Sequence, residues 1–197
     1  MDSQVTLIGS DSESEFAAPG PEFGTSTTLD FDCDVMKSMN ATVRGQSHIQ
    51  YSVRTVKGGL VGMNPKTIFS QKERILATVQ RRGVLPDSLT LGSKSMSLGS
   101  WLKRPLFSSF PASFSEGGET YLWKECQDGG IALYKGSTST SAIARFYPSY
   151  FAVTYDRRRI THCAHLDLEP EADLIREKVF ISCVLVVQKT GKNAKAK

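Results

Sequence analysis

Short runs in which apolar and polar residues alternate follow one another through the middle of the chain. In the run 48–56, Ile49, Tyr51 and Val53 alternate with polar residues, which places the apolar side chains on one face of a β-strand. Similar runs occupy 66–71, 74–81, 88–93, 95–104, 120–126 and 131–135, followed by "AIARFYP", "YFAVTY" and "RITHCAHLDLE". About eight to twelve short strands, with no helical period before residue 170, predict an all-β barrel or sandwich.

Turn-forming residues separate these runs. Asp128, Gly129 and Gly130 lie between two β-type runs, and this composition predicts a hairpin turn that tolerates positive φ. Residues 105–118 contain two prolines and a pair of adjacent glycines, and we expect them to form a loop. A second tight turn is expected at 156–159.

The most apolar stretch, 179–187, lies near the C-terminus, with Glu177 and Lys178 before it and Lys189 after it. As a helix, nine residues that rise about 1.5 Å each span roughly 14 Å, about half of the ~30 Å hydrocarbon core of a bilayer. Extending the helix toward the N-terminus would bring charged residues into that core. We therefore expect no transmembrane segment.

The same stretch is compatible with a buried strand and with a buried helix. Its valines and isoleucine are β-branched, which favours a strand. The flanking residues favour a helix, because Pro170 suits a first helical position and Glu169, Glu171 and Asp173 suit the positive end of the helix dipole. A helix that is apolar around its whole circumference must be enclosed by protein.

The charges divide the chain into an acidic head and a basic body. Residues 1–34 contain eight of the 20 acidic groups and no Lys or Arg, so the other 163 residues carry 24 basic and 12 acidic groups. Residues 1–45 also lack an apolar period and are rich in Ser, Gly and Pro, which predicts a disordered acidic arm. A basic body attracts partners that are rich in phosphate, such as lipid head groups or nucleic acid.

The cysteines and the N-terminal sequence bear on the compartment. The four cysteines, at 33, 126, 163 and 183, form no CxxC pair, and no basic segment followed by an apolar run begins the chain. We therefore expect reduced thiols in a monomeric cytoplasmic protein, with a peripheral-membrane or nuclear location as alternatives.

Five segments in a fixed order carry a resemblance to a known family: ILATVQRRG (75–83), SLGSWLK (97–103), YLWKE (121–125), SAIARFYP (141–148) and LDLEPEADLIREKVFISCVLVVQK (166–189). By their order and spacing the chain resembles a fungal family of uncharacterised proteins. That family is a domain of unknown function in the tubby C-terminal-like superfamily, with the LURP-one-related and phospholipid-scramblase proteins. The resemblance implies a mainly β fold, a closed antiparallel β-barrel of about twelve strands enclosing a hydrophobic C-terminal helix.

The predicted organisation has three parts. Residues 1–45 form the arm, residues 46–190 form the tubby-like barrel domain with its C-terminal helix at about 170–189, and residues 191–197 form a flexible basic tail. The charged residues Arg176, Glu177 and Lys178 are expected at the mouth of the barrel, outside its seal.

The sequence predicts no enzyme, no cofactor and no metal site. Neither a G-x-S-x-G motif nor a cysteine nucleophile signature is present. His162 and His165 flank Cys163, but on a strand they point to opposite faces and do not share one ion. The acids at 167–173 lack EF-hand spacing, so we interpret them as residues of the helix start.

Seven basic residues are the candidates for an anion-binding or phospholipid-binding site, since Arg side chains pair well with phosphate oxygens. They are Arg157, Arg158 and Arg159 in the turn at 156–159, and Arg81, Arg82, Lys103 and Arg104 near strand ends. If the loops of one rim gather them, they form a single patch.

Three hypotheses for function follow from these observations. The basic body, together with the resemblance, favours a non-catalytic binding module for anionic phospholipid head groups at a membrane surface. The alternative is an intracellular protein-interaction or scaffold domain, with an unknown protein partner, that uses the acidic arm. The third is nucleic-acid binding through the basic surface, although no RNP-like aromatic motif occurs and no specific nucleic acid is expected.

Overall fold

The structure is a computed structural model of the chain, and it describes residues 26–32, 38–58, 64–153, 155 and 158–190. In the first half of this part the strands are β1 (Thr27–Phe31), β2 (Ser38–Val43), β3 (Ile49–Val56), β4 (Lys66–Gln71), β5 (Arg74–Gln80), β6 (Ser88–Leu91) and β7 (Lys94–Ser97). In the second half they are β8 (Ala112–Glu116), β9 (Glu119–Glu125), β10 (Ile131–Lys135), β11 (Ala142–Tyr147), β12 (Tyr150–Val153), β13 (Arg159–His162) and β14 (His165–Leu168). The helices are α1 (Leu98–Trp101), α2 (Pro170–Asp173) and α3 (Arg176–Thr190).

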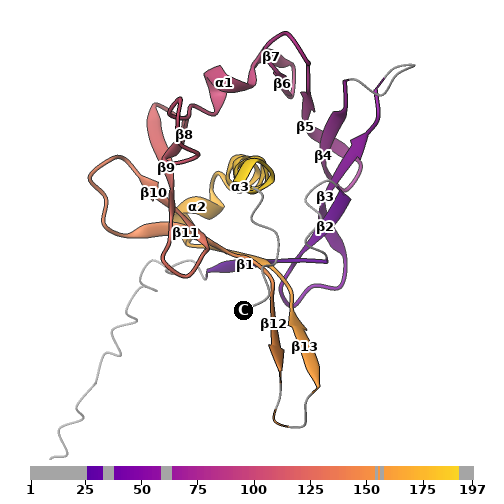
Figure 1. The fold of residues 1–197 in the computed structure, drawn as a ribbon, viewed down its shortest axis with the longest axis vertical. Helices are drawn as coiled ribbons and strands as arrows, with labels where there is room; N and C mark the ends of the chain where they lie inside the picture. The colour runs from indigo at the N-terminus through magenta and orange to yellow at the C-terminus, as the bar shows by residue number, and fades with distance from the viewer. Residues whose placement is uncertain (1–25, 33–37, 59–63, 154, 156–157, 191–197) are drawn as a thin grey trace, which may run out of the picture.

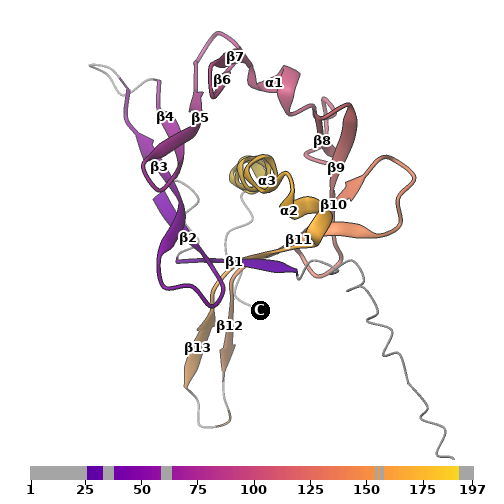
Figure 2. The ribbon, with the colours of Figure 1, turned by 180° about the vertical axis from the view of Figure 1, so that it is seen from behind.

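Twelve strands form one antiparallel sheet that curls around α3 (Figures 1 and 2). Their order across the sheet is β7-β6-β5-β4-β3-β2-β1-β14-β11-β10-β9-β8. Strands β12 and β13 form a separate two-stranded hairpin that projects away from α3 in both views. The mainly β class and the antiparallel pairing agree with the alternating pattern of the sequence.

The prediction of a closed barrel is wrong, because the two edge strands β7 and β8 do not pair with each other. After β7 the chain turns into α1, where the Ser97 hydroxyl accepts a hydrogen bond of 3.1 Å from the backbone N–H of Ser100. This cap ends the strand that the sequence predicts over 95–104 at Ser97, so β7 itself does not reach β8. Between the two edges, the Trp101 ring of α1 stacks on Phe114 of β8 at 5.5 Å. Side-chain packing, together with one backbone bridge between Lys103 and Ser113 of β8, therefore covers this opening.

The most apolar stretch of the chain is helical and lies in the interior. All nine residues from 179 to 187 are buried within α3, including the neighbours Val184 and Leu185, which face directions about 100° apart. The Phe180 ring lies 4.7 Å from the Tyr51 ring of β3 and 6.3 Å from the Phe31 ring of β1. The curled sheet therefore encloses the apolar helix on all sides, even though its edges stay open.

The predicted helix at about 170–189 is interrupted. The short helix α2 begins at Pro170, and α3 begins at Arg176 after Leu174 and Ile175. Ala172 of α2 is buried, whereas Leu174 is 87% exposed. No helix in the described part of the chain is both long enough and apolar enough to span a bilayer.

Part of the predicted disordered arm belongs to the sheet. Within the predicted arm of 1–45, β1 lies between β2 and β14, and its residues Leu29 and Phe31 are buried. Two inward-facing residues are too few to be recognised as an apolar period in the sequence. The strand forms because β2 and β14 pair with it on both sides. Residues 1–25 of the arm, and the predicted tail 191–197, lie outside the described residues.

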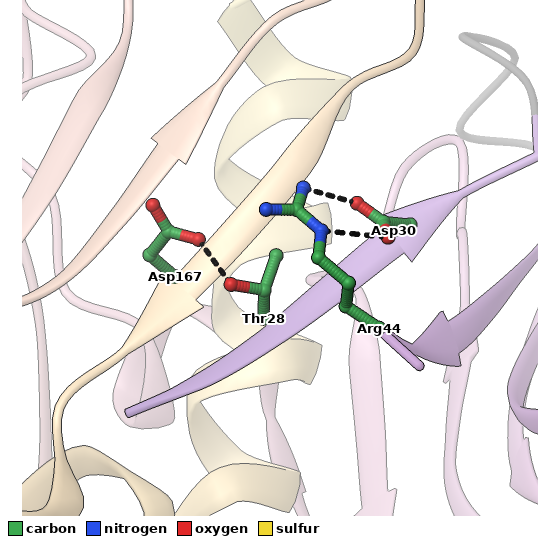
Figure 3. Close-up of polar contacts among 4 residues, drawn as sticks. All are labelled: Thr28, Asp30, Arg44 and Asp167. Atoms are coloured by element: carbon green, nitrogen blue, oxygen red, sulfur yellow. Dashed lines mark hydrogen bonds and ion pairs between the residues drawn. The ribbon is translucent and has the colours of Figure 1, made fainter. Parts of the chain in front are cut away.

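Polar contacts fix β1 against both of its neighbours (Figure 3). The Arg44 guanidinium donates two hydrogen bonds to the Asp30 carboxylate, at 2.6 and 3.1 Å. On the other side, the Thr28 hydroxyl donates to the Asp167 carboxylate of β14 at 2.7 Å. Two acids that the sequence places in the arm or at the helix start therefore hold the sheet together.

Two other local predictions have different outcomes. The hairpin turn at Asp128, Gly129 and Gly130 is confirmed, because it joins β9 to β10 and Gly129 has a φ of 84°. The predicted loop at 105–118 is only partly a loop, since it contains β8. Strand β8 alternates the buried Ala112 and Phe114 with serines, a pattern that the surrounding prolines and glycines obscure.

Candidate functional site

Strand register brings a series of basic residues to one end of the curled sheet. Val56 at the end of β3 pairs with Lys66, and Lys66 pairs with Gln80 at the end of β5. The residues that follow or precede these strand ends therefore lie at the same end. We call the six basic residues of this end the basic rim: Lys57, Lys66, Arg81, Arg82, Lys103 and Arg104.

The β5–β6 loop of the basic rim is held by one carboxylate. Asp87 accepts a hydrogen bond of 2.6 Å from the Arg81 guanidinium and one of 2.9 Å from the backbone N–H of Arg82. The backbone N–H of Arg81 also donates to the carbonyl of Pro65 at 3.0 Å, which joins this loop to the start of β4. Asp87 neutralises Arg81, but the exposed side chain of Arg82 forms no ion pair with a described residue.

Arg104 places the rim at the C-terminal half of α3. Its guanidinium donates a hydrogen bond of 3.0 Å to the carbonyl of Leu185. Its Nε atom is buried, and no described group pairs with it. Burial lowers the pKa of Arg104, and the positive charge of nearby Arg81 lowers it further. The rim therefore holds two arginines close enough to repel each other.

The opposite end of the sheet, around the start of α3, has a different charge arrangement. Arg74 pairs there with Glu177, Arg176 with Asp173, Lys178 with Glu116, and Lys135 with Glu171. A pocket of about 320 Å³ opens at this end, lined by Tyr51, Gln71, Glu116 and residues 173–178. The four cations named here already have carboxylate partners, so they offer little charge to an added anion.

The remaining candidate arginines lie elsewhere. The β12–β13 hairpin is on the far side of α3 from β5, β6 and β7 in both views (Figures 1 and 2). Arg158 is exposed in this hairpin, whereas Arg157 and the side chain of Arg159 lie outside the described residues. Among the candidates that the structure describes, four share the basic rim and Arg158 lies apart from it.

Sequence reasoning missed two members of the basic rim, Lys57 and Lys66. Both are exposed and flank the connection between the predicted strands 48–56 and 66–71. Because consecutive antiparallel strands place alternate connections at the same end of a sheet, counting connections could have assigned both lysines to the end that holds Arg81.

The histidines and cysteines do not assemble a reactive centre among the described residues. The His162 ring stacks on Tyr150 at 4.4 Å, and the His165 ring stacks on Tyr147 at 4.6 Å, in two different strand pairs. No cluster of three His, Cys, Asp or Glu side chains in the described ranges could hold a metal ion. Burial in α3 raises the pKa of the Cys183 thiol far above its ordinary value, which makes this cysteine unreactive.

Fold and site together define the class of protein: a mainly β domain whose curled antiparallel sheet encloses a C-terminal helix and carries a basic rim at one end. Residues 36–192 match a family of unknown function (DUF6593), and the chain belongs to this family. The match begins after β1 and includes the whole basic rim. No curated protein and no solved structure shows a significant match to the chain. Membership in a family of unknown function, as the order of the motifs indicates, is confirmed.

Proposed function

We propose that this domain is a non-catalytic binding module that docks onto anionic phospholipid membranes through the basic rim. One observation carries the proposal, namely the difference in charge pairing between the two ends of α3. Around the start of α3, four cations are paired with carboxylates, and two exposed turn lysines, Lys72 and Lys94, form no ion pair with a described residue. At the basic rim, Asp87 pairs with Arg81, and the exposed cations Lys57, Lys66, Arg82 and Lys103 form no ion pair with a described residue.

Cations without partners suit an anionic surface. Each Lys or Arg close to an acidic membrane contributes about 1 kcal/mol of binding free energy, and the attraction fades over a Debye length of about 10 Å at 0.1 M salt. Cations that are already paired with carboxylates contribute less, because the membrane must compete with the existing partner. The basic rim is therefore the end of the molecule that an acidic bilayer attracts.

The resemblance supports the same proposal by analogy. The motif order is similar to that of a fungal family in the tubby C-terminal-like superfamily, whose relatives include phospholipid-scramblase proteins. The proposal therefore includes membership in this superfamily. It also includes a cytoplasmic location with peripheral association to membranes. A shared fold does not fix function, so the charge arrangement carries more weight than the analogy. The alternative role, in which the acidic arm binds a protein, depends on residues 1–25, which lie outside the described residues.

Vesicle flotation with the full chain tests the proposal. Phosphatidylcholine vesicles with phosphatidylserine should capture the protein, and phosphatidylcholine alone should not. The double variant Arg82→Ser/Lys103→Ser should bind roughly 30-fold more weakly if each charge contributes about 1 kcal/mol.

The matched control is Lys72→Ser/Lys94→Ser, which removes two exposed lysines from the turns at the opposite end of the sheet. Both variants lose the same net charge, so only their location differs. Equal weakening by the two variants would mean that net charge, and not the basic rim, governs binding. Absence of binding by the unaltered protein would reject the proposed function.

A further inference from the structure

Two loops at the basic rim expose bulky apolar side chains to solvent. In the β5–β6 loop, Val84 is 98% exposed and Leu85 is 62% exposed. In the loop between α1 and β8, Leu106 is 94% exposed and Phe107 is 100% exposed. Scattered single apolar residues are ordinary on a protein surface, but adjacent pairs at the tips of two loops are a feature that requires an explanation.

Both loops have the same order of residue types. They read RRGVL at 81–85 and KRPLF at 103–107, so that two basic residues, one glycine or proline and two apolar residues follow one another. Arg81 of the first loop lies close enough to Arg104 of the second for its charge to lower the pKa of Arg104. The backbone N–H of Leu98 also donates to the carbonyl of Asp87 at 2.7 Å, which joins the β5–β6 loop to α1. The same combination of charge and apolar surface therefore occurs twice at one end of the molecule.

We propose that these two loops, 82–86 and 104–108, insert their apolar tips into the interfacial region of an anionic bilayer while the basic rim contacts the lipid phosphates. We call them the insertion loops. This inference rests on the proposed function and adds the mode of attachment to it. It also predicts the orientation of the bound domain. The C-terminal half of α3 lies toward the membrane, and the pocket at the start of α3 faces away from it.

A bilayer fits this surface better than a protein partner does. A stable protein interface buries about 800 Å² on each partner in a contiguous, closely packed patch. Here the apolar side chains protrude from two separate loops, and each follows cations that a protein interface would have to pair. Isolated protruding side chains can enter the interfacial region of a bilayer one by one. The cations next to them then lie at the level of the lipid phosphates.

The insertion loops are held by hydrogen bonds behind their tips. Asp87 fixes the first loop through Arg81 and the backbone of Arg82. In the second loop, the Ser108 hydroxyl accepts from the backbone N–H of Phe110 at 3.1 Å and donates to its carbonyl at 2.7 Å. Backbone hydrogen bonds between Lys103 and Ser113, at 2.8 Å, fix the base of that loop. Because these hydrogen bonds hold the bases of the loops, less conformational entropy is lost when the tips enter a membrane.

Affinity and depth measurements on the full chain test the inference, with vesicles of phosphatidylcholine and phosphatidylserine. Leu106→Ser should weaken binding by roughly 10- to 150-fold, because burial of a leucine side chain contributes on the order of 1.5–3 kcal/mol and a serine contributes none. The matched control is Leu174→Ser, which makes the same change at a side chain 87% exposed at the opposite end. The control should bind like the unaltered protein.

Depth is measured with Phe107→Trp and vesicles that carry bromine at defined positions of the acyl chains. Bromines near the interface should quench the fluorescence of the Phe107→Trp variant, whereas the Leu174→Trp variant should not be quenched. The native Trp101 and Trp123 are buried, and the unaltered protein with the same vesicles supplies their background.

Three outcomes separate this inference from the proposed function. Weaker binding of Leu106→Ser, with quenching in Phe107→Trp alone, supports insertion. Binding that Arg82→Ser/Lys103→Ser weakens but Leu106→Ser does not, without quenching, overturns insertion and leaves the proposed function standing. No vesicle binding by the unaltered protein overturns both.

Discussion

The indole nitrogen of Trp123 donates a hydrogen bond of 3.0 Å to the hydroxyl of Ser182 in the interior, between β9 and α3. Ser182 in turn donates to the carbonyl of Val179 at 3.1 Å, so its hydroxyl is satisfied in both roles. The side chains packed around this bond between sheet and helix are mainly apolar and can slide past one another, whereas a hydrogen bond requires a defined direction. The bond therefore helps to fix the rotation of α3 inside the sheet.

Ser182→Ala should destabilise the domain by about 1–3 kcal/mol, because it leaves the Trp123 N–H buried without an acceptor. Chemical denaturation followed by circular dichroism measures the change. Ser137→Ala, at an exposed position, is the control and should be nearly neutral. In Trp123→Phe the donor is already absent, so there the same Ser182→Ala substitution should cost less. An equal cost in both backgrounds would contradict a stabilising role for the bond.

Removing residues 1–40 should unfold the domain, although the sequence alone predicts a dispensable arm. The deletion removes β1 from between β2 and β14 and cuts off the first three residues of β2, together with the buried side chains of Leu29, Phe31 and Met39. Loss of a cooperative thermal transition is the expected result. Removing residues 1–25 is the control, because every described strand stays in place, and it should retain the transition. A deletion of 1–40 that melts like the intact protein would show that neither β1 nor the start of β2 is required.

Val184→Asp and Leu185→Asp should each abolish folding. Both side chains are buried although they are adjacent on α3, so neither carboxylate can reach solvent by a small rotation of the helix. An unpaired buried charge costs several kcal/mol against a total stability of about 5–15 kcal/mol. Gel filtration and circular dichroism of the purified variants measure the outcome. Leu174→Asp, at an exposed position, should fold, and a folded monomer of either α3 variant would contradict enclosure on all sides.

Asp128 should make the stability of the β9–β10 turn sensitive to acid. Its carboxylate accepts a hydrogen bond of 3.0 Å from the backbone N–H of Gly130 and one of 2.8 Å from Arg145. These contacts, the Gly130 N–H first, lower the pKa of Asp128 in the folded state. A lowered folded-state pKa gives stability that is complete above the unfolded pKa of about 3.9 and is lost as the pH falls through the folded value.

Asp128→Asn should therefore have a lower melting temperature than the unaltered protein at neutral pH, and the difference should shrink as the medium is acidified below about pH 4. Differential scanning calorimetry across this range measures it. A difference that stays constant into strong acid would show that the charge of Asp128 contributes no stability.

Local signals predicted the elements whose formation depends on neighbouring residues. Alternation of Ile49, Tyr51 and Val53 with polar residues is enough to predict β3, because side chains of a strand alternate between two faces. Glycines at 129 and 130 are enough for the turn between β9 and β10. The sequence was less informative at β1, whose inward residues are few, and at α1, where the Ser97 cap stops a strand that the alternation would continue.

The candidate site shows the same division. The sequence identified Arg81, Arg82, Lys103 and Arg104 as basic residues near strand ends, but it could not show that they share one rim or that the β12–β13 hairpin lies apart from it. It also gave no reason to connect Leu106 and Phe107 with the basic residues before them, because apolar residues in a loop ordinarily indicate partial burial. The exposure of the apolar loop residues and the proximity of the basic residues depend on the pairing of strands that are far apart in the sequence.

By itself, the sequence determined that the domain is mainly β and that 179–187 must be buried, because strand alternation, turn residues and an apolar run are properties of neighbouring residues. Only the tertiary structure decided that the sheet stays open between β7 and β8, that β1 belongs to it, and that six cations share one end of the sheet, where Arg104 contacts α3. Those features depend on contacts between residues far apart in the chain, such as Trp101 with Phe114 and Arg104 with Leu185. Such contacts form only when the whole sheet has curled around its helix.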